Sequence, residues 1–202
     1  LSFAPLCGLL VAVAAILIIR RIFKINRFHG PADSIFAAHR TDNELDVRAG
    51  IGSTLAAFVS AGGGGSVGQY GPLVHFGATM GSFMRQHTGG MLSTDVFIGC
   101  GVAGAIAAGF NAPIAGIIFA HEAILRHFSL RAIAPIAIAS ITAAGVSKWM
   151  FGDSYLFAMD KINVDLIALL PAALIAGPLF GLVAVLFMMS IRHSARFAAS
   201  SG

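Results

Sequence analysis

A Gly-Pro pair marks each of two candidate helix breaks, residues 28–32 and residues 68–72, which read FHGPA and GQYGP. Both residue types stop a helix, and proline is also favoured in the first turn of a new one. Amides at a helix start lack an intrahelical acceptor and carry a partial positive charge, so they bind anions. The pattern therefore predicts an anion site built on two helix starts. Its expected residues are His29, Gly30, Pro31, Ala32, Gly68, Gln69, Tyr70, Gly71 and Pro72.

Four side chains could add chemistry to these amides. The hydroxyl of Tyr70 can donate a hydrogen bond to an anion, which would make this residue a gate, or its ring can pack beside the path. His29 can supply an N–H donor, although a histidine close to a basic cluster is commonly solvated. His75 and His121 lie in apolar segments, where an ionisable side chain is a functional candidate. A neighbouring carbonyl can also satisfy a neutral imidazole there, so both interpretations stay open.

Other kinds of site find no support in the sequence. No nucleophile stands in a pattern typical of a catalytic triad, and neither H-E-x-x-H nor C-x-x-C spacing occurs. The glycine-rich residues 62–68 lack the lysine of a phosphate-binding loop. Cys7 and Cys100 lie in separate apolar segments, which argues against a disulfide framework or a metal site. We therefore expect no enzyme activity, no metal and no cofactor.

The elements that carry these residues are predicted to be membrane helices. The 202 residues are 57% hydrophobic and 11% charged, whereas soluble domains have about 25% charged residues. Lipid offers the backbone no hydrogen-bond partners, so apolar spans must be helical. The sequence thus predicts an integral, multi-pass α-helical protein of the lipid bilayer. Runs without Asp, Glu, Lys or Arg cover residues 1–19, 49–84, 96–121, 132–147 and 166–191.

Several of the expected helices are too short to cross a bilayer alone, because a crossing needs about 20 residues. Broken helices are tolerated at membrane depth where the irregular backbone lines a cavity or is buried in protein. A short helix should begin near Pro31, and small residues between 99 and 104 predict a closely packed helix face. The other helices are expected over residues 3–22, 49–61, 72–85, 95–108, 113–126, 130–150 and 164–191.

The net charge of +4 does not predict a nucleic-acid partner, because the cations do not share one face. Four of them follow the first span directly, and the positive-inside rule makes that end cytoplasmic. These residues are Arg20, Arg21, Lys24 and Arg27.

Three stretches resemble the CLC chloride channel and transporter family. Residues 104–119, GAIAAGFNAPIAGIIF, are similar to the family segment G-x-x-A-x-x-x-F-N-A-P-[IL]-A-G-x-x-F over many consecutive positions. Residues 68–72 resemble the family element G-[KR]-E-G-P, which opens a pore-lining helix. Residues 28–32 stand where the family carries G-S-G-I-P, whose serine and amides contact the central anion.

This resemblance implies an all-α membrane fold of broken and tilted helices. Residues 1–202 would form one partial domain, similar to the first of two inverted repeats. The second repeat, with its G-x-F-x-P element and late pore tyrosine, is not recognisable in the sequence. The family further implies chloride or a similar small anion as the transported ion. It also implies a homodimer with a pore in each subunit, and a place in the cell membrane.

The chain departs from the family at the positions that carry protons. Tyr70 replaces the gating glutamate, and Ala123 replaces the inner proton glutamate, while Glu122 matches a common family glutamate that we interpret as structural. A phenol with a pKa near 10 stays neutral at physiological pH. We therefore expect passive anion conduction without proton coupling. Two alternatives remain, an antiporter that moves protons through His75, His121 or Glu122, and a non-conducting membrane scaffold plugged by Tyr70.

Overall fold

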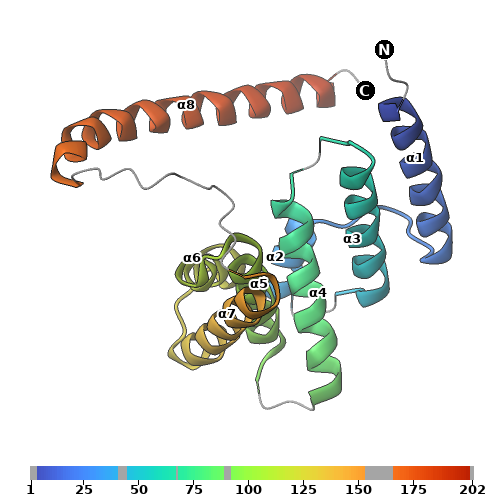
Figure 1. Cartoon of the computed structure of the whole chain (residues 1–202), viewed down its shortest axis with the longest axis horizontal. Helices are drawn as coiled ribbons and strands as arrows, with labels where there is room; N and C mark the ends of the chain where they lie inside the picture. The colour runs from blue at the N-terminus through green and yellow to red at the C-terminus, as the bar shows by residue number, and fades with distance from the viewer. Residues whose placement is uncertain (1–3, 41–44, 67, 89–91, 153–165, 201–202) are drawn as a thin grey trace. The chain divides into compact units, whose positions relative to one another are not determined.

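The computed structural model describes residues 4–40, 45–66, 68–88, 92–152 and 166–200, which are helical with no strand among them (Figure 1). These residues fall into two units, one within Leu1–Leu156 and one within Phe157–Gly202. The predicted all-α fold class is confirmed. The helices are α1 (Ala4–Ile22), α2 (Pro31–His39), α3 (Val47–Gly62), α4 (Tyr70–Thr88), α5 (Thr94–Phe110), α6 (Pro113–Phe119), the π-helix η1 (Ala120–Leu125), α7 (Leu130–Phe151) and α8 (Leu166–Ser200).

Short local signals begin and end the helices of the first unit. Asp46 precedes α3, and its carboxylate accepts the N–H of Ala49 at 3.0 Å, which satisfies one free amide of the first turn. Asn111 ends α5 in the left-handed conformation, with φ of 51°. Asparagine tolerates this conformation better than most residues. Pro113 then occupies the first turn of α6, where its missing N–H costs nothing.

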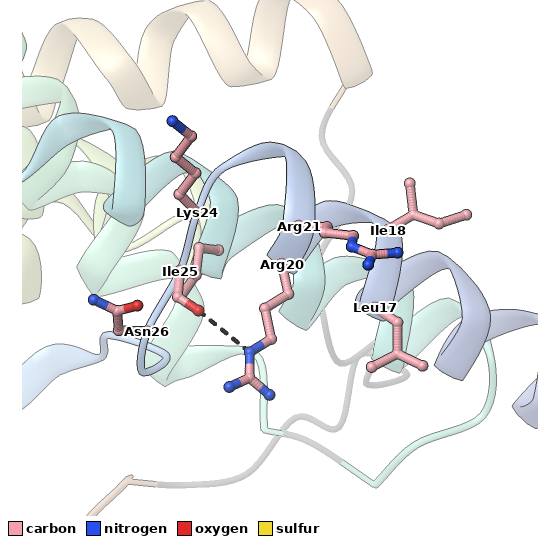
Figure 2. Close-up of a pocket in the computed structure, with 7 residues that line it drawn as sticks. All are labelled: Leu17, Ile18, Arg20, Arg21, Lys24, Ile25 and Asn26. Carbon is pink, nitrogen blue, oxygen red and sulfur yellow. Dashed lines mark hydrogen bonds between the residues drawn. The ribbon is translucent and has the colours of Figure 1, made fainter.

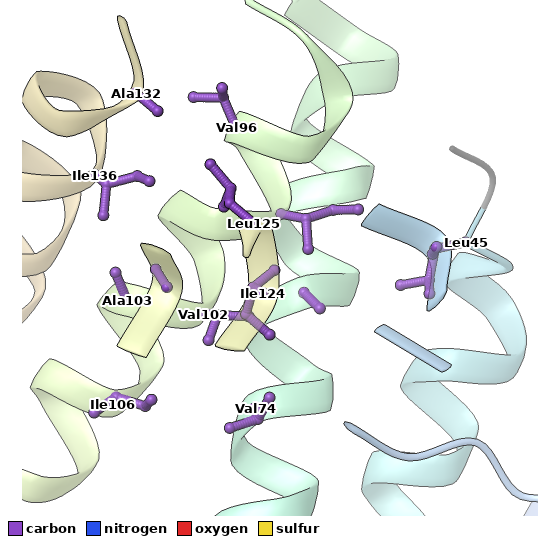
Figure 3. Close-up of a cluster of buried hydrophobic side chains, with 14 residues drawn as sticks. Leu45, Val74, Val96, Val102, Ala103, Ile106, Ile124, Leu125, Ala132 and Ile136 are labelled. Carbon is purple, nitrogen blue, oxygen red and sulfur yellow. The ribbon is translucent and has the colours of Figure 1, made fainter. Parts of the chain in front are cut away.

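Helix α5 is the centre of the first unit and packs against α4, α6, η1 and α7. A cluster of apolar side chains from these helices forms the core, and Figure 3 shows that they converge from both sides of α5. Val74 of α4, Ile124 of η1 and Ile136 of α7 are fully buried in it.

The contact between α4 and α5 is so close that only glycine fits at several positions. A Cβ atom added to Gly81 would lie 2.1 Å from the carbonyl oxygen of Phe97, and one added to Gly101 would lie 2.0 Å from that of Gly77. Small residues are what allow helix backbones to approach in membrane proteins. The predicted close packing is confirmed at Gly101, whose partner is α4, whereas Gly99 faces Leu125 and Ile136 and Gly104 faces Ala143 of α7.

Among the described helices, two are long and apolar enough to cross a bilayer, over Leu130–Phe151 and Leu169–Phe197. The second lies in α8, which contains Pro171 and Pro178 and forms the helical part of the second unit. Along residues 169–197 its large apolar side chains are exposed within the chain, for example Leu174 at 75%.

Most helix boundaries differ from the sequence prediction by a few residues, and three differences have a local reason. Helix α4 begins at Tyr70 rather than Pro72, because the amide of Leu73 reaches the carbonyl of Gln69 at 3.1 Å. The single helix expected over residues 113–126 is α6 followed by the π-helical turn η1. Helix α8 continues to Ser200 rather than ending at residue 191, since its basic residues are compatible with a helix.

Candidate anion site between two helix starts

The two predicted breaks meet in the structure. A cavity of about 110 Å³ lies where the start of α2, the middle of α3 and the start of α4 come together. A Cβ atom added to Gly71 would lie 3.5 Å from the ring of Pro31, so the two helix starts are in direct contact. The space suffices for a small anion or a few water molecules. Its lining includes His29, Gly30, Pro31, Ser53, Gly71, Pro72 and His75.

The remaining predicted residues lie near this cavity but do not line it. Ala32 is exposed on α2, and Gly68 and Gln69 are exposed before α4. Tyr70 is 45% exposed, and its ring stands edge-on to Phe119 with the ring centres 5.7 Å apart. Five of the nine predicted residues therefore line one cavity, and the other four are not part of its lining.

Some backbone N–H groups at the start of α2 already donate hydrogen bonds within the protein. The amide of Gly30 donates to Oδ2 of Asp33 at 2.9 Å, and the amide of His29 donates to the hydroxyl of Ser53 at 3.0 Å. Pro31 has no amide hydrogen, so Ala32 holds the first-turn N–H with no backbone partner among the described residues. Two of the expected amide donors thus point to protein acceptors.

Asp33 places a carboxylate beside the proposed anion site. Asp33 lies in α2, which is too short to cross a membrane. Its Oδ1 pairs with the guanidinium of Arg27. Burial raises the pKa of Asp33, but the Gly30 amide and Arg27 act against it, and the net pKa is below the ordinary value. The carboxylate is therefore ionised at neutral pH, and Arg27 balances its charge.

The start of α4 supplies the other side of the cavity. The amides of Tyr70 and Gly71 belong to its first turn, where no intrahelical acceptor exists, and Pro72 has no amide hydrogen. Both Gly71 and Pro72 line the cavity. Helix dipoles from α2 and α4 place partial positive charge at this point.

His75, one turn into α4, is not one of the nine residues predicted for the anion site, although its place in an apolar segment makes it a functional candidate. Its side chain is 1% exposed and lines the cavity, and Nδ1 lies 2.8 Å from the hydroxyl of Ser34 in α2. The rings of His75 and His29 meet edge to face, with centres 6.1 Å apart. The available signal was a histidine in an apolar segment, which by itself does not indicate a position in the fold.

His121 lies in η1, outside this cavity. It is 1% exposed and stacks on Phe128, with ring centres 5.1 Å apart, and neither ring nitrogen has a partner among the described residues. Glu122 is exposed and Ala123 is partly buried. Within the described part of the chain, no hydrogen bond connects His121 with His75.

The described ranges contain no group of three His, Cys, Asp or Glu side chains suited to a metal ion. A larger hollow of about 550 Å³ lies at the end of α1 (Figure 2). It is bordered by Arg20, Arg21 and Lys24 of the basic cluster. There Nε of Arg20 donates a hydrogen bond to the carbonyl of Ile25 at 3.2 Å. Lys24, just before Ile25, has a left-handed backbone conformation with φ of 53°. Basic side chains at a helix C-terminus complement its partial negative charge.

Comparison with known proteins gives one family. The model of the voltage-gated chloride channel family matches residues 6–201. The chain is 26% identical over 176 residues to the voltage-gated ClC-type chloride channel ClcB of Citrobacter koseri, covering 83% of this chain and 41% of the relative. It is 27% identical over 162 residues to a putative chloride channel protein, ClcB-like, of Ralstonia nicotianae, covering 74% of this chain and 38% of the relative. The chain thus spans about two fifths of these relatives, and no solved structure matched it.

Proposed function

Since the chain belongs to the voltage-gated chloride channel family, we propose that it conducts small anions such as chloride passively through a membrane. The ion would bind where α2 and α4 begin. The observation that carries this proposal is that two helix starts, 39 residues apart in sequence, share one cavity of about 110 Å³. Partial positive charge from two helices suits a monovalent anion without a fixed cation to trap it.

The proposed conduction is independent of protons. Tyr70 and Ala123 stand where the family carries its proton-bearing glutamates, and neither offers a carboxylate. Glu122 is exposed on η1 and does not line the cavity. The two buried histidines lie in different environments without a connecting hydrogen bond among the described residues, which gives little support to a relay through them.

The working molecule is proposed to be a homodimer in the cell membrane, with a separate pore in each subunit. The apolar side chains exposed along α8 and α7 would then face lipid, the partner subunit or further parts of the protein. Tyr70 would restrict access to the cavity from outside, since it is the first residue of α4 and lies beside the lining residues.

Flux in liposomes tests the proposal. The protein translated from the whole reading frame should release chloride down its gradient when a potassium ionophore balances charge, while the external pH stays constant. Uptake of protons in step with chloride release would replace the channel with an antiporter. Chloride retention equal to that of empty liposomes would favour a non-conducting scaffold.

A further inference from the structure

His75 has one ring nitrogen whose hydrogen-bonding capacity is unused. Its side chain is 1% exposed, Nδ1 lies 2.8 Å from the Ser34 hydroxyl, and Nε2 has no partner in the described structure. A buried polar atom without a partner destabilises the folded protein, because it has lost its hydrogen bonds to water. Such atoms are rare in native proteins, and an absent ion or water is one physical reason for them.

The Ser34 contact determines which nitrogen carries the proton. If the hydroxyl donates to Nδ1, the hydroxyl hydrogen and the Nδ1 lone pair are both satisfied, and the proton of the neutral ring lies on Nε2. If the hydroxyl instead accepts from Nδ1–H, its own hydrogen and the lone pair of Nε2 both lack partners. The first arrangement leaves one orphaned group and the second leaves two. Ser34 therefore holds the ring with an N–H donor at Nε2.

Protein acceptors for this N–H are already in use. The carbonyl of Gly30 lies close enough to the imidazole to attract a ring N–H as a hydrogen-bond acceptor does. It already accepts the amides of Asp33 and Ser34, at 3.1 and 3.4 Å, and Nε2 does not meet it with the distance and angle of a hydrogen bond. The ring of His29 meets His75 edge to face, and this contact is not a hydrogen bond.

The cavity is where the missing acceptor fits. His75 lines it together with Gly71 and Pro72 from the start of its own helix, and with Gly30 and Pro31 from the facing one. Both helix starts favour negative charge at this place. A water molecule could also accept the hydrogen bond, but it would not gain from the two helix dipoles as an anion does.

We propose that Nε2–H of His75 is a hydrogen-bond donor to the anion in the cavity, and that Ser34 positions the ring for this contact. The inference rests on the proposed anion site. It adds a side-chain donor to the backbone amides of that site. A neutral donor stabilises the ion without a full positive charge, which keeps binding weak enough for release.

Substitutions at both ends of the Ser34–His75 pair test the inference. Chloride affinity would be measured by titration calorimetry on the purified full-length protein, with chloride release from liposomes as a second readout. His75→Leu removes the donor and should weaken chloride binding about tenfold, which corresponds to about 1.4 kcal/mol. His75→Gln retains an N–H donor and should bind more tightly than the leucine variant. Ser34→Ala should fall between wild type and His75→Leu.

His87→Leu is the matched control, because His87 is an exposed histidine of the same helix whose Nδ1 bonds to the Phe83 carbonyl. It should leave chloride affinity unchanged. A bromide-soaked crystal of the wild type adds a measurement independent of any variant. Bromide should lie within about 3.5 Å of Nε2, in hydrogen-bond range for a large ion.

The outcomes separate this inference from the proposed function. If wild type binds and conducts chloride but folded His75→Leu is unchanged, the inference is wrong and the proposed function stands. If the leucine variant does not fold, bromide density remote from Nε2, or water alone beside it, overturns the inference. If wild type neither binds nor conducts chloride, the proposed function itself fails.

Discussion

Tyr70 combines an exposed position with a specific aromatic contact. It begins α4, is 45% exposed, and places its ring edge-on to Phe119 at 5.7 Å. An aromatic pair of this kind contributes roughly 0.5–1.5 kcal/mol beyond its buried area. The residue can therefore be replaced without large loss of stability, which makes its role in conduction measurable.

We expect Tyr70→Ala to raise chloride flux, because it removes the ring beside the cavity and leaves the backbone of α4 in place. Tyr70→Phe keeps the ring and removes the hydroxyl. If the hydroxyl donates to the ion, chloride binding should weaken by the roughly 1.5–3 kcal/mol of a hydrogen bond to a charged group. Liposome flux and calorimetry measure the two effects. Wild-type flux and affinity in both variants would make Tyr70 a packing residue.

In the proposed site, Asp33 would compete with the anion for the Gly30 amide, which donates to its Oδ2. Asp33→Ala should free this N–H and remove a negative charge beside the cavity, so chloride affinity should rise. The same change removes an acceptor from the first turn of α2, at a cost of about 1 kcal/mol in stability. Calorimetry and thermal unfolding would record the two opposite effects. Unchanged chloride affinity with reduced stability would show that the carboxylate has a structural role alone.

The pH dependence of this stabilisation has a definite sign. The pKa of Asp33 in the folded protein is below its ordinary value. Its contribution is therefore present at neutral pH and is lost as pH falls through the lowered value. The stability difference between wild type and Asp33→Ala should shrink on acidification below the usual aspartate range.

At the scale of helices, the contact between α4 and α5 holds the start of α4 in position. Gly77 and Gly81 of α4 face Gly101 and Phe97 of α5 at distances that exclude a Cβ atom. The buried side chain of Thr79 adds a bond to the carbonyl of His75 at 2.8 Å within α4. Because α4 carries both Gly71 and His75, a displacement of this helix would also disturb the cavity.

Gly81→Ala should destabilise the protein by several kcal/mol, since the added Cβ would lie 2.1 Å from a backbone oxygen and the helices would have to separate. Gly145→Ala is the control, because no atom lies within 4 Å of a Cβ added there on α7. It should be neutral or stabilising by roughly 0.5–1 kcal/mol. Thermal unfolding in detergent compares them, and equal stability of the two variants would contradict this account of the interface.

At the scale of the whole molecule, the exposed apolar side chains indicate which surroundings the chain requires. Leu10 and Val11 of α1, Ile114 of α6 and Trp149 of α7 are between 69% and 85% exposed. Water would oppose so much apolar surface, whereas lipid or protein would accept it. Membership of a membrane channel family agrees with this property. Because the chain spans about two fifths of its relatives, further protein surface could cover part of it.

Much of the helical framework follows from the sequence alone. Pro31, Pro113 and the glycine-rich residues before α4 mark helix boundaries by rules that involve only neighbours along the chain. The helix-start chemistry of the proposed anion site follows from the same rules. The hydrogen bond from the Gly30 amide to Asp33 also follows from local sequence. Asp33 stands three residues after Gly30, which is the spacing of a capping carboxylate.

Only the tertiary structure decided which of these elements meet. Ser34 and His75 are 41 residues apart, and their hydrogen bond exists because α2 packs on α4. The same packing joins Pro31 to Gly71 and encloses the cavity, whereas Tyr70 remains outside it on Phe119. Helix propensity depends on adjacent residues, but contacts between distant helices depend on the fit of whole surfaces. The sequence therefore determined the donors, and the packing determined which donors share a site.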